Sequence, residues 1–162
     1  MTFFLIALGK LVLLISKTFN LGSGSTWPGH IALESDKNFI KKLLSRNKEL
    51  KIILVAGTNG KTTTGKLIQT ILEKNDRKVF QNEGGANLLN GLASSLINQS
   101  DLTGKINYDF AVFEVDENSL PIVLRNLNPQ IIVLLNLFRD QLDRYGEVDI
   151  VADKWKKAIN TV

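Results

Sequence analysis

The stretch ILVAGTNGKTTTGKLI, residues 53–68, joins an apolar run to a glycine-containing turn and to the start of a helical pattern. Gly57 and Gly60 allow the backbone of this turn to bend tightly, so that successive N–H groups can point at one place. A strand before the turn and a helix after it put those N–H groups at the positive end of the helix. The stretch therefore predicts a site for phosphate groups.

Two side chains of the turn have definite roles in such a site. Lys61 would reach the β- and γ-phosphates of a nucleotide, and the Thr62 hydroxyl would ligand Mg²⁺. The general motif begins with a glycine five residues before the Gly-Lys pair, where this chain has Val55. The alternative is a glycine turn capped by threonines. The strand and helix that flank the turn favour the nucleotide site.

Short apolar runs alternate with helical stretches beyond residue 50. The expected strands are 51–56, 78–82, 109–115 and 130–136, and the expected helices are 61–74, 88–99, 119–127 and 147–159. Strands that are nearly continuous in Val, Ile and Leu, alternating with helices, predict a parallel sheet covered on both faces. The predicted fold is therefore α/β, with a P-loop-type parallel sheet preceded by an amino-terminal helical segment. Ligands of such sheets bind beyond the carboxyl ends of the strands.

Three more segments follow predicted strands. NEGGAN, residues 82–87, combines glycines with the Asn87 amide, and an ordinary turn is as good an interpretation as a functional loop. FEVDEN, residues 113–118, offers three carboxylates, of which Glu114 is the first candidate for Mg²⁺. The other two carboxylates fit capping of the next helix better. The polar segment NLFRDQLDRYGE, residues 136–147, suits a solvated loop and a nucleotide-side site equally.

The amino terminus is apolar over residues 3–15 except at Gly9 and Lys10. This run is shorter than the roughly 20 residues of a membrane span. It also lacks the order of a secretory signal, because Lys10 interrupts the apolar run. We expect a helix that must be covered by protein or by lipid. Packing on a protein domain is the favoured interpretation, and interfacial contact with a membrane is the alternative.

The segment that follows is dense in Gly, Ser and Pro and predicts a loop over residues 20–30. The apolar spacing after it predicts a second helix over residues 35–48. We therefore expect two parts: residues 1–50 with the amino-terminal helices and the loop, and residues 51–162 with the first part of a nucleotide-binding domain.

Composition narrows the class of protein. The chain has 162 residues, 44% of them hydrophobic and 22% charged, as in a globular domain. Its 13 Lys and Arg against 5 Asp and Glu up to Phe80, and 7 against 11 afterwards, give a basic half and an acidic half. A basic half could bind phosphates and an acidic half could hold a cation, so this division favours those ligands over nucleic acid. We therefore expect no nucleic-acid partner. The absence of cysteine excludes disulfides and thiolate chemistry within these residues.

Five stretches together resemble the Mur ligase family, ATP-dependent amide-forming enzymes of cell-wall and folate metabolism. They are GSTWPGHIAL, AGTNGKTTT, NEGGAN, FEVDENSLP and NLFRDQLDRYGE, and their order and spacing are most similar to the branch that amidates lipid II. The resemblance implies an ATP loop with Lys61 as its catalytic residue. The loop residues it implies are Thr58, Asn59, Gly60, Lys61, Thr62 and Thr63. It also implies Asn87 near the phosphates, and Thr62 and Glu114 around Mg²⁺.

The implied reaction begins when ATP phosphorylates the α-carboxylate of D-glutamate in the lipid II stem peptide. Ammonia then attacks the acyl phosphate, while Lys61 and Mg²⁺ stabilise charge on the transferred phosphoryl group. Because this stretch has no cysteine to hydrolyse glutamine, ammonia would come from a partner, a GatD-like glutamine amidotransferase subunit. The resemblance implies a cytoplasmic protein, with the inner face of the cell membrane as a candidate contact.

The sequence departs from the family pattern in two ways. Gln141 stands where many members have a histidine near the metal. The family's central domain is expected to continue past residue 162, with a cysteine zinc ribbon in the lipid II branch and a further carboxy-terminal domain. Zinc is expected only there, and residues 1–162 alone are expected to be inactive. The alternatives are another Mur-type ligase, such as a folylpolyglutamate synthase, or a truncated nucleotide-binding protein without turnover.

Overall fold

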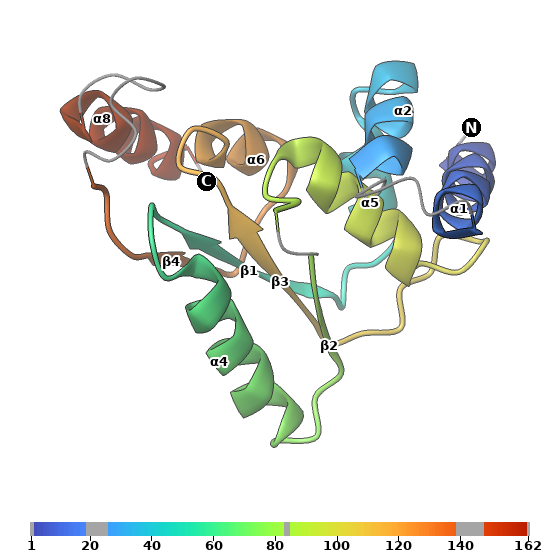
Figure 1. Cartoon of the computed structure of the whole chain (residues 1–162), viewed down its shortest axis with the longest axis horizontal. Helices are drawn as coiled ribbons and strands as arrows, with labels where there is room; N and C mark the ends of the chain where they lie inside the picture. Colours follow the sequence, from blue (N-terminus) through green and yellow to red (C-terminus); the bar gives the residue numbers. More distant parts are fainter. Residues whose placement is uncertain (1, 19–25, 83–84, 139–147, 162) are drawn as a thin grey trace.

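The computed structural model describes residues 2–18, 26–82, 85–138 and 148–161. In this part of the chain, four parallel strands form one sheet in the order β2-β3-β1-β4 (Figure 1). The strands are β1 (Lys51–Ala56), β2 (Val79–Gln81), β3 (Phe110–Val115) and β4 (Ile131–Leu134). The predicted parallel sheet is confirmed. Because β1 lies between β3 and β4, the turn after β1 has a neighbouring strand end on each side.

Helices cover both faces of the sheet. The first three are α1 (Thr2–Thr18), α2 (Trp27–Ser35) and α3 (Phe39–Leu44). The others described are α4 (Lys61–Glu73), α5 (Leu89–Gln99), α6 (Leu120–Asn126) and α8 (Val148–Ile159). Among these, α4 covers one face, and α5, α6 and α8 lie on the other (Figure 1). The amino-terminal helices pack beside α5, with α2 in closest contact. The α/β architecture is the predicted one.

Alternation of side chains along the strands divides the buried core in two. The side chains facing α4 form a small cluster of Ile53, Val55, Val79 and Val112. The opposite face carries Leu54 and Phe113 and belongs to a much larger cluster. That cluster also contains Ile6 of α1 and Phe39 of α3. The amino-terminal helices and the sheet therefore bury apolar surface against each other, which is the main stabilising contribution to such a fold.

Two predictions for the amino-terminal part are wrong. The loop predicted over 20–30 is wrong for its last four residues, because α2 begins at Trp27, and residues 20–25 lie outside the described residues. Pro28 lies in the first turn of α2, where a helix needs no N–H from the residue. The predicted helix over 35–48 is instead the end of α2, a break and the six-residue α3. Asp36 causes the break: its backbone is extended, with φ −151° and ψ 99°.

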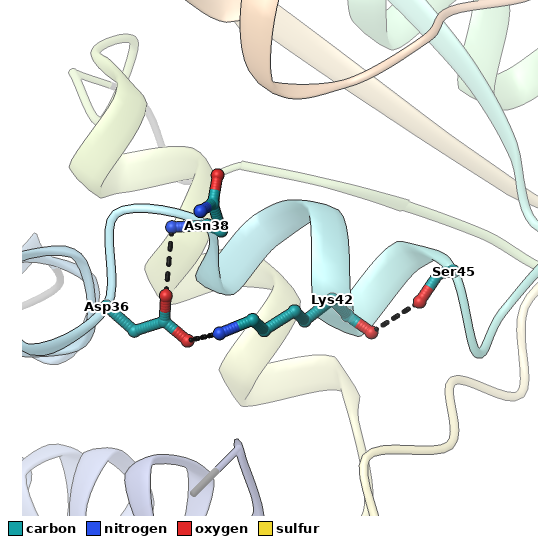
Figure 2. A network of polar contacts seen from close by, with 4 residues as sticks. All are labelled: Asp36, Asn38, Lys42 and Ser45. Atoms are coloured by element: carbon teal, nitrogen blue, oxygen red, sulfur yellow. Dashed lines mark hydrogen bonds and ion pairs between the residues drawn. The ribbon is translucent and has the colours of Figure 1, made fainter.

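The Asp36 side chain holds the break in place. Its carboxylate accepts the Asn38 N–H at 3.0 Å and the Lys42 ammonium at 2.6 Å (Figure 2). Local side-chain bonds of this kind compete with helix formation, and an apolar pattern does not reveal them. At the other end of α3, the Ser45 hydroxyl donates to the Lys42 carbonyl at 2.9 Å.

Helix α1 packs on the domain through one side. Leu5 and Ile6 are buried there, and Gly9 lets α1 approach its neighbours closely. A Cβ on Gly9 would lie 3.0 Å from Ile97 and 3.3 Å from Pro28. No helix within the described ranges is long and apolar enough to cross a bilayer.

Candidate functional site

The turn between β1 and α4 depends on its two glycines. Gly57 has φ 153° and Gly60 has φ 85°, conformations that other residues rarely adopt. At Gly57 there is also no room for a side chain, because a Cβ would lie 2.9 Å from Leu135 Cβ. Gly60 immediately precedes α4. The glycines therefore bring the chain from the end of the central strand directly into the first turn of a helix.

The first turn of α4 offers the N–H groups suited to phosphate. The first N–H groups of a helix have no partner within it, and here the earliest intrahelical bond runs from Thr64 N to Gly60 O at 2.9 Å. Lys61 is half-buried, and its ammonium donates to the carbonyls of Gly57 at 2.6 Å and Thr58 at 2.9 Å. The ammonium thus lies over the turn, where a phosphate chain would be held.

The structure brings Thr62 and Glu114 together. The Thr62 hydroxyl donates to Glu114 Oε2 at 2.8 Å, although 52 residues separate the two in sequence. The cause is strand order, since β3 pairs directly with β1 and places Glu114 opposite Val55. A hydroxyl and a carboxylate are the oxygen ligands that Mg²⁺ takes beside a nucleotide, so the donor set fits this metal. The metal role of these two residues stays a prediction.

Asn82 fixes Glu114 from the β2 side, a role that the sequence analysis missed. Its amide oxygen accepts the Glu114 N–H at 2.8 Å, and its amide nitrogen donates to the Glu114 carbonyl at 3.0 Å. The same nitrogen donates to the Ala86 carbonyl at 2.8 Å. With Asn82 5% exposed and Glu114 6% exposed, these bonds are shielded from water. Asn82 therefore ties the segment after β2 to the candidate metal ligand.

Gly65 allows α4 to approach the sheet beside this carboxylate. A Cβ at Gly65 would lie 3.2 Å from Gln81 Nε2 and 3.7 Å from Glu114 Cγ. Gln81 Nε2 is buried and donates no hydrogen bond to any described residue. Gly65 thus approaches both this amide donor and the Glu114 side chain, and nothing in the local sequence pattern indicated this.

Asn87 and Asp116 meet through the backbone. The Asp116 N–H donates to the Asn87 carbonyl at 3.0 Å, which brings the NEGGAN segment beside the end of β3. The Asp116 carboxylate accepts the Asn118 N–H at 3.1 Å in the turn before α6. This bond does not cap the helix, because Ser119 is the N-cap and no side chain bonds there, so the predicted capping role of Asp116 is wrong. Burial raises the pKa of the Asp116 carboxyl above its ordinary value, partly opposed by the Asn118 bond and by the charge of Lys61. The proximity of the Asn87 side chain to phosphates stays a prediction.

Asn136 clamps the phosphate turn from the β4 side. Its backbone carbonyl accepts the Thr58 N–H at 2.8 Å, and its side-chain oxygen accepts the Asn59 N–H at 3.0 Å. Its amide nitrogen donates back to the Asn59 carbonyl at 3.2 Å. The N–H groups of Thr58 and Asn59 are therefore bonded to Asn136, and they shape the turn. The contact of these two residues with a nucleotide stays a prediction. Gln141 and the rest of residues 139–147 lie outside the described residues.

A cavity of about 550 Å³ lies at the amino ends of the strands, near the start of β1. Its rim carries Lys41, Lys48 and Arg125. None of the residues that the sequence analysis assigned to nucleotide or metal lines it. The candidate site is therefore the carboxyl edge, where the glycine turn, the Thr62–Glu114 contact and the two asparagine clamps converge.

Known proteins share this arrangement of sequence and fold. Residues 55–161 match the family described as the Mur ligase middle domain. The lipid II isoglutaminyl synthase (glutamine-hydrolyzing) subunit MurT of Staphylococcus aureus is 40% identical over 137 residues, which are 85% of this chain and 30% of that protein. The MurT subunit of Streptococcus pneumoniae is 42% identical over 129 residues, which are 79% of this chain and 28% of that protein. The chain thus spans under a third of these relatives.

Solved structures of Mur ligases have the same fold. The MurF ligase of Thermotoga maritima in complex with ADP aligns with a TM-score of 0.65 at 24% identity, over 78% of this chain and 29% of that one. MurF of Acinetobacter baumannii aligns with a TM-score of 0.64 at 20% identity, over 77% and 26%. These likenesses concern the fold, whereas the family match and the MurT relatives concern sequence. On that evidence, the chain belongs to the Mur ligase family.

Proposed function

We propose that this chain is the ATP-binding part of a ligase that amidates the α-carboxylate of D-glutamate in the lipid II stem peptide. The observation that carries the proposal is the contact between Thr62 and Glu114 beside the glycine turn. The MurT relatives support the choice of reaction, because each is named as a subunit of lipid II isoglutaminyl synthase. Since the chain matches only 30% of the S. aureus relative, the reaction is proposed for a longer protein that carries this segment.

Different groups of the site would bind different parts of Mg-ATP. The first-turn N–H groups of α4, from Lys61 to Thr63, would receive the phosphate oxygens. The Lys61 ammonium would exchange the carbonyls of Gly57 and Thr58 for the β- and γ-phosphates. Thr62 and Glu114 would hold Mg²⁺, which offsets negative charge on the phosphates when bound.

In this proposal the γ-phosphoryl group passes from ATP to the glutamate carboxylate, and ADP is the leaving group. Ammonia then attacks the acyl carbon, the C–N bond of the amide forms, and inorganic phosphate leaves with the proton that the nitrogen loses. Lys61 would stabilise the negative charge that develops on the transferred group. A GatD-like glutamine amidotransferase partner would supply the ammonia, as the words "glutamine-hydrolyzing" in the names of the relatives suggest. We place the protein in the cytoplasm, with residues 1–50 as an amino-terminal part and residues 51–162 as the nucleotide-binding part.

Lys61→Ala in a full-length protein that carries this segment tests the proposal. We expect ATP-dependent amidation of lipid II to fall about 100- to 1,000-fold, because a preorganised charge at the phosphates is lost. The free energy of unfolding should change by less than about 1 kcal/mol, since Lys61 packs no core. Mass spectrometry of lipid II and chemical denaturation measure the two effects.

Lys66→Ala is the matched control, because Lys66 is an exposed lysine in the same helix. Among the described residues, its ammonium donates one hydrogen bond, to the Gln69 side chain at 3.4 Å. It should leave both activity and stability unchanged. Wild-type amidation by the Lys61→Ala protein would exclude the glycine turn as the ATP site.

A further inference from the structure

One face of α1 is exposed although its side chains are large and apolar. Its members, which we call the outer face, are Phe3, Phe4, Leu11, Leu14 and Ile15, with exposed fractions from 43% to 64%. At about 100° per residue these positions fall within one arc of about 120°, opposite the buried Leu5 and Ile6. Monomeric soluble proteins rarely expose a continuous apolar patch unless it binds something.

The charged residues of the first 33 positions are all basic. Residues 1–33 contain Lys10 and Lys17 and no Asp or Glu. Lys10 is half-buried beside the outer face, with its ammonium 3.2 Å from the Asn98 carbonyl. Helices that lie in the surface of a bilayer combine an apolar face that enters the lipid with basic residues that attract anionic headgroups.

A helix that crosses the bilayer is not available within the described ranges. A helix that lies along the surface requires only one apolar face, which α1 has.

We propose that the outer face of α1 binds the surface of a lipid bilayer that contains anionic lipid. The inference deepens the proposed function, because an enzyme that acts on lipid II meets its substrate at a membrane. It is carried by the outer face itself and by the charge of residues 1–33. Helix α1 lies at one end of the molecule, away from the start of α4, so a bilayer under α1 leaves the phosphate turn open to solvent (Figure 1).

Co-sedimentation of the chain with vesicles tests this inference without lipid II or ATP. The vesicles contain phosphatidylcholine with phosphatidylglycerol, or phosphatidylcholine alone. The test variant is Phe4→Ser with Leu11→Ser, which changes side chains that are 64% and 52% exposed. The matched control is Leu67→Ser with Ile71→Ser on α4, which changes side chains that are 60% and 53% exposed. Circular dichroism of each protein verifies that it is folded.

We expect the wild-type chain and the α4 control to bind the mixed vesicles equally. The α1 variant should bind at least about tenfold more weakly, because two apolar side chains no longer enter the lipid. Phe4→Leu, which keeps an apolar side chain, should retain binding. Phosphatidylcholine alone should bind the wild-type chain more weakly than the mixture.

Three results would overturn the inference: no binding of the wild-type chain to mixed vesicles, an equal loss for the α4 control, or equal binding to both kinds of vesicle. A wild-type dimer that the α1 variant abolishes would show instead that a second copy covers the outer face. Vesicle binding by a protein that does not amidate lipid II would leave this inference standing and count against the proposed function alone.

Discussion

The two sides of the phosphate turn are built differently. On the β3 side, Asn82 and Glu114 are both buried, and three hydrogen bonds join the asparagine side chain to backbone groups. On the β4 side, Asn136 makes a comparable number of bonds to Thr58 and Asn59, but its side-chain contacts are exposed. The strand beside it is also half-exposed, with Ile131 and Leu134 open to solvent.

The difference teaches that similar asparagine clamps need not contribute equally to stability. A buried group that loses its partner cannot turn to water, so its desolvation is uncompensated. An exposed group that loses its partner binds water instead. We therefore expect the β3 side to be a rigid part of the native state and the β4 side to act mainly on the shape of the turn.

Asn82→Leu should have the largest effect on stability. The change leaves the Glu114 N–H, the Glu114 carbonyl and the Ala86 carbonyl without the side-chain partner they have now. We expect the free energy of unfolding to fall by about 3 kcal/mol, since each buried polar group left unpaired costs roughly 1–3 kcal/mol. Chemical denaturation of the chain measures this loss.

Asn126→Ala is the control for Asn82→Leu. Its side chain donates one exposed bond to the Ile122 carbonyl, so the loss should stay within about 0.5 kcal/mol. A similar loss for Asn126→Ala and Asn82→Leu would mean that the burial of Asn82 has no special importance.

Asn136→Ala should have a smaller effect on stability and a clear effect on binding. We expect a loss of about 1 kcal/mol or less in the free energy of unfolding, because water can replace the exposed bonds. The affinity for Mg-ADP should fall, because Asn136 no longer holds the Asn59 backbone from both sides. Calorimetric titration measures the affinity, and a loss of stability equal to that of Asn82→Leu would refute the distinction between the two sides.

The smallest effect on stability is expected for Asp36→Asn. Asp36 lies in the break between α2 and α3, distant from both sides of the turn. The hydrogen bond from Lys42 holds the pKa of Asp36 below its ordinary value, so the carboxylate stabilises the fold when it is charged. This contribution is fully present above about pH 4 and is lost as the pH falls through the lowered pKa. Asp36→Asn should therefore be less stable than the wild type near neutral pH, and the difference should shrink in acid. Thermal melts at several pH values measure it, and a constant difference down to about pH 2 would contradict the assignment.

Local patterns predicted the parts of the molecule that are encoded locally. The apolar run of β1, the glycines after it and the period of α4 lie within residues 53–68, so the turn and Lys61 could be identified directly. Thr62 and Glu114 were each assigned to Mg²⁺ from their own motifs, and the family resemblance implied the same pair. Their contact depends on β3 pairing with β1, which neither motif shows.

The two clamps and the break at Asp36 could not be predicted in this way. Asn82 and Asn136 follow strands as many asparagines do. Only the strand order shows that Asn82 and Asn136 lie on opposite sides of the turn after β1. Gly65 looks like a weak position in a helix until Gln81 and Glu114 are seen beside it. At Asp36, a side-chain bond to the backbone ended a helix that the apolar period would have continued.

The order of the strands also has a consequence for synthesis on the ribosome. Lys51 of β1 pairs with Phe110 of β3, so the central strand emerges about 60 residues before its first hydrogen-bonding neighbour. At roughly 5–20 residues per second, that interval is several seconds during which an apolar segment has no strand beside it. The amino-terminal helices are made before β1, and α1 and α3 share its core cluster. They are therefore the first partners that can shelter the nascent strand from aggregation while the rest of the sheet is being translated.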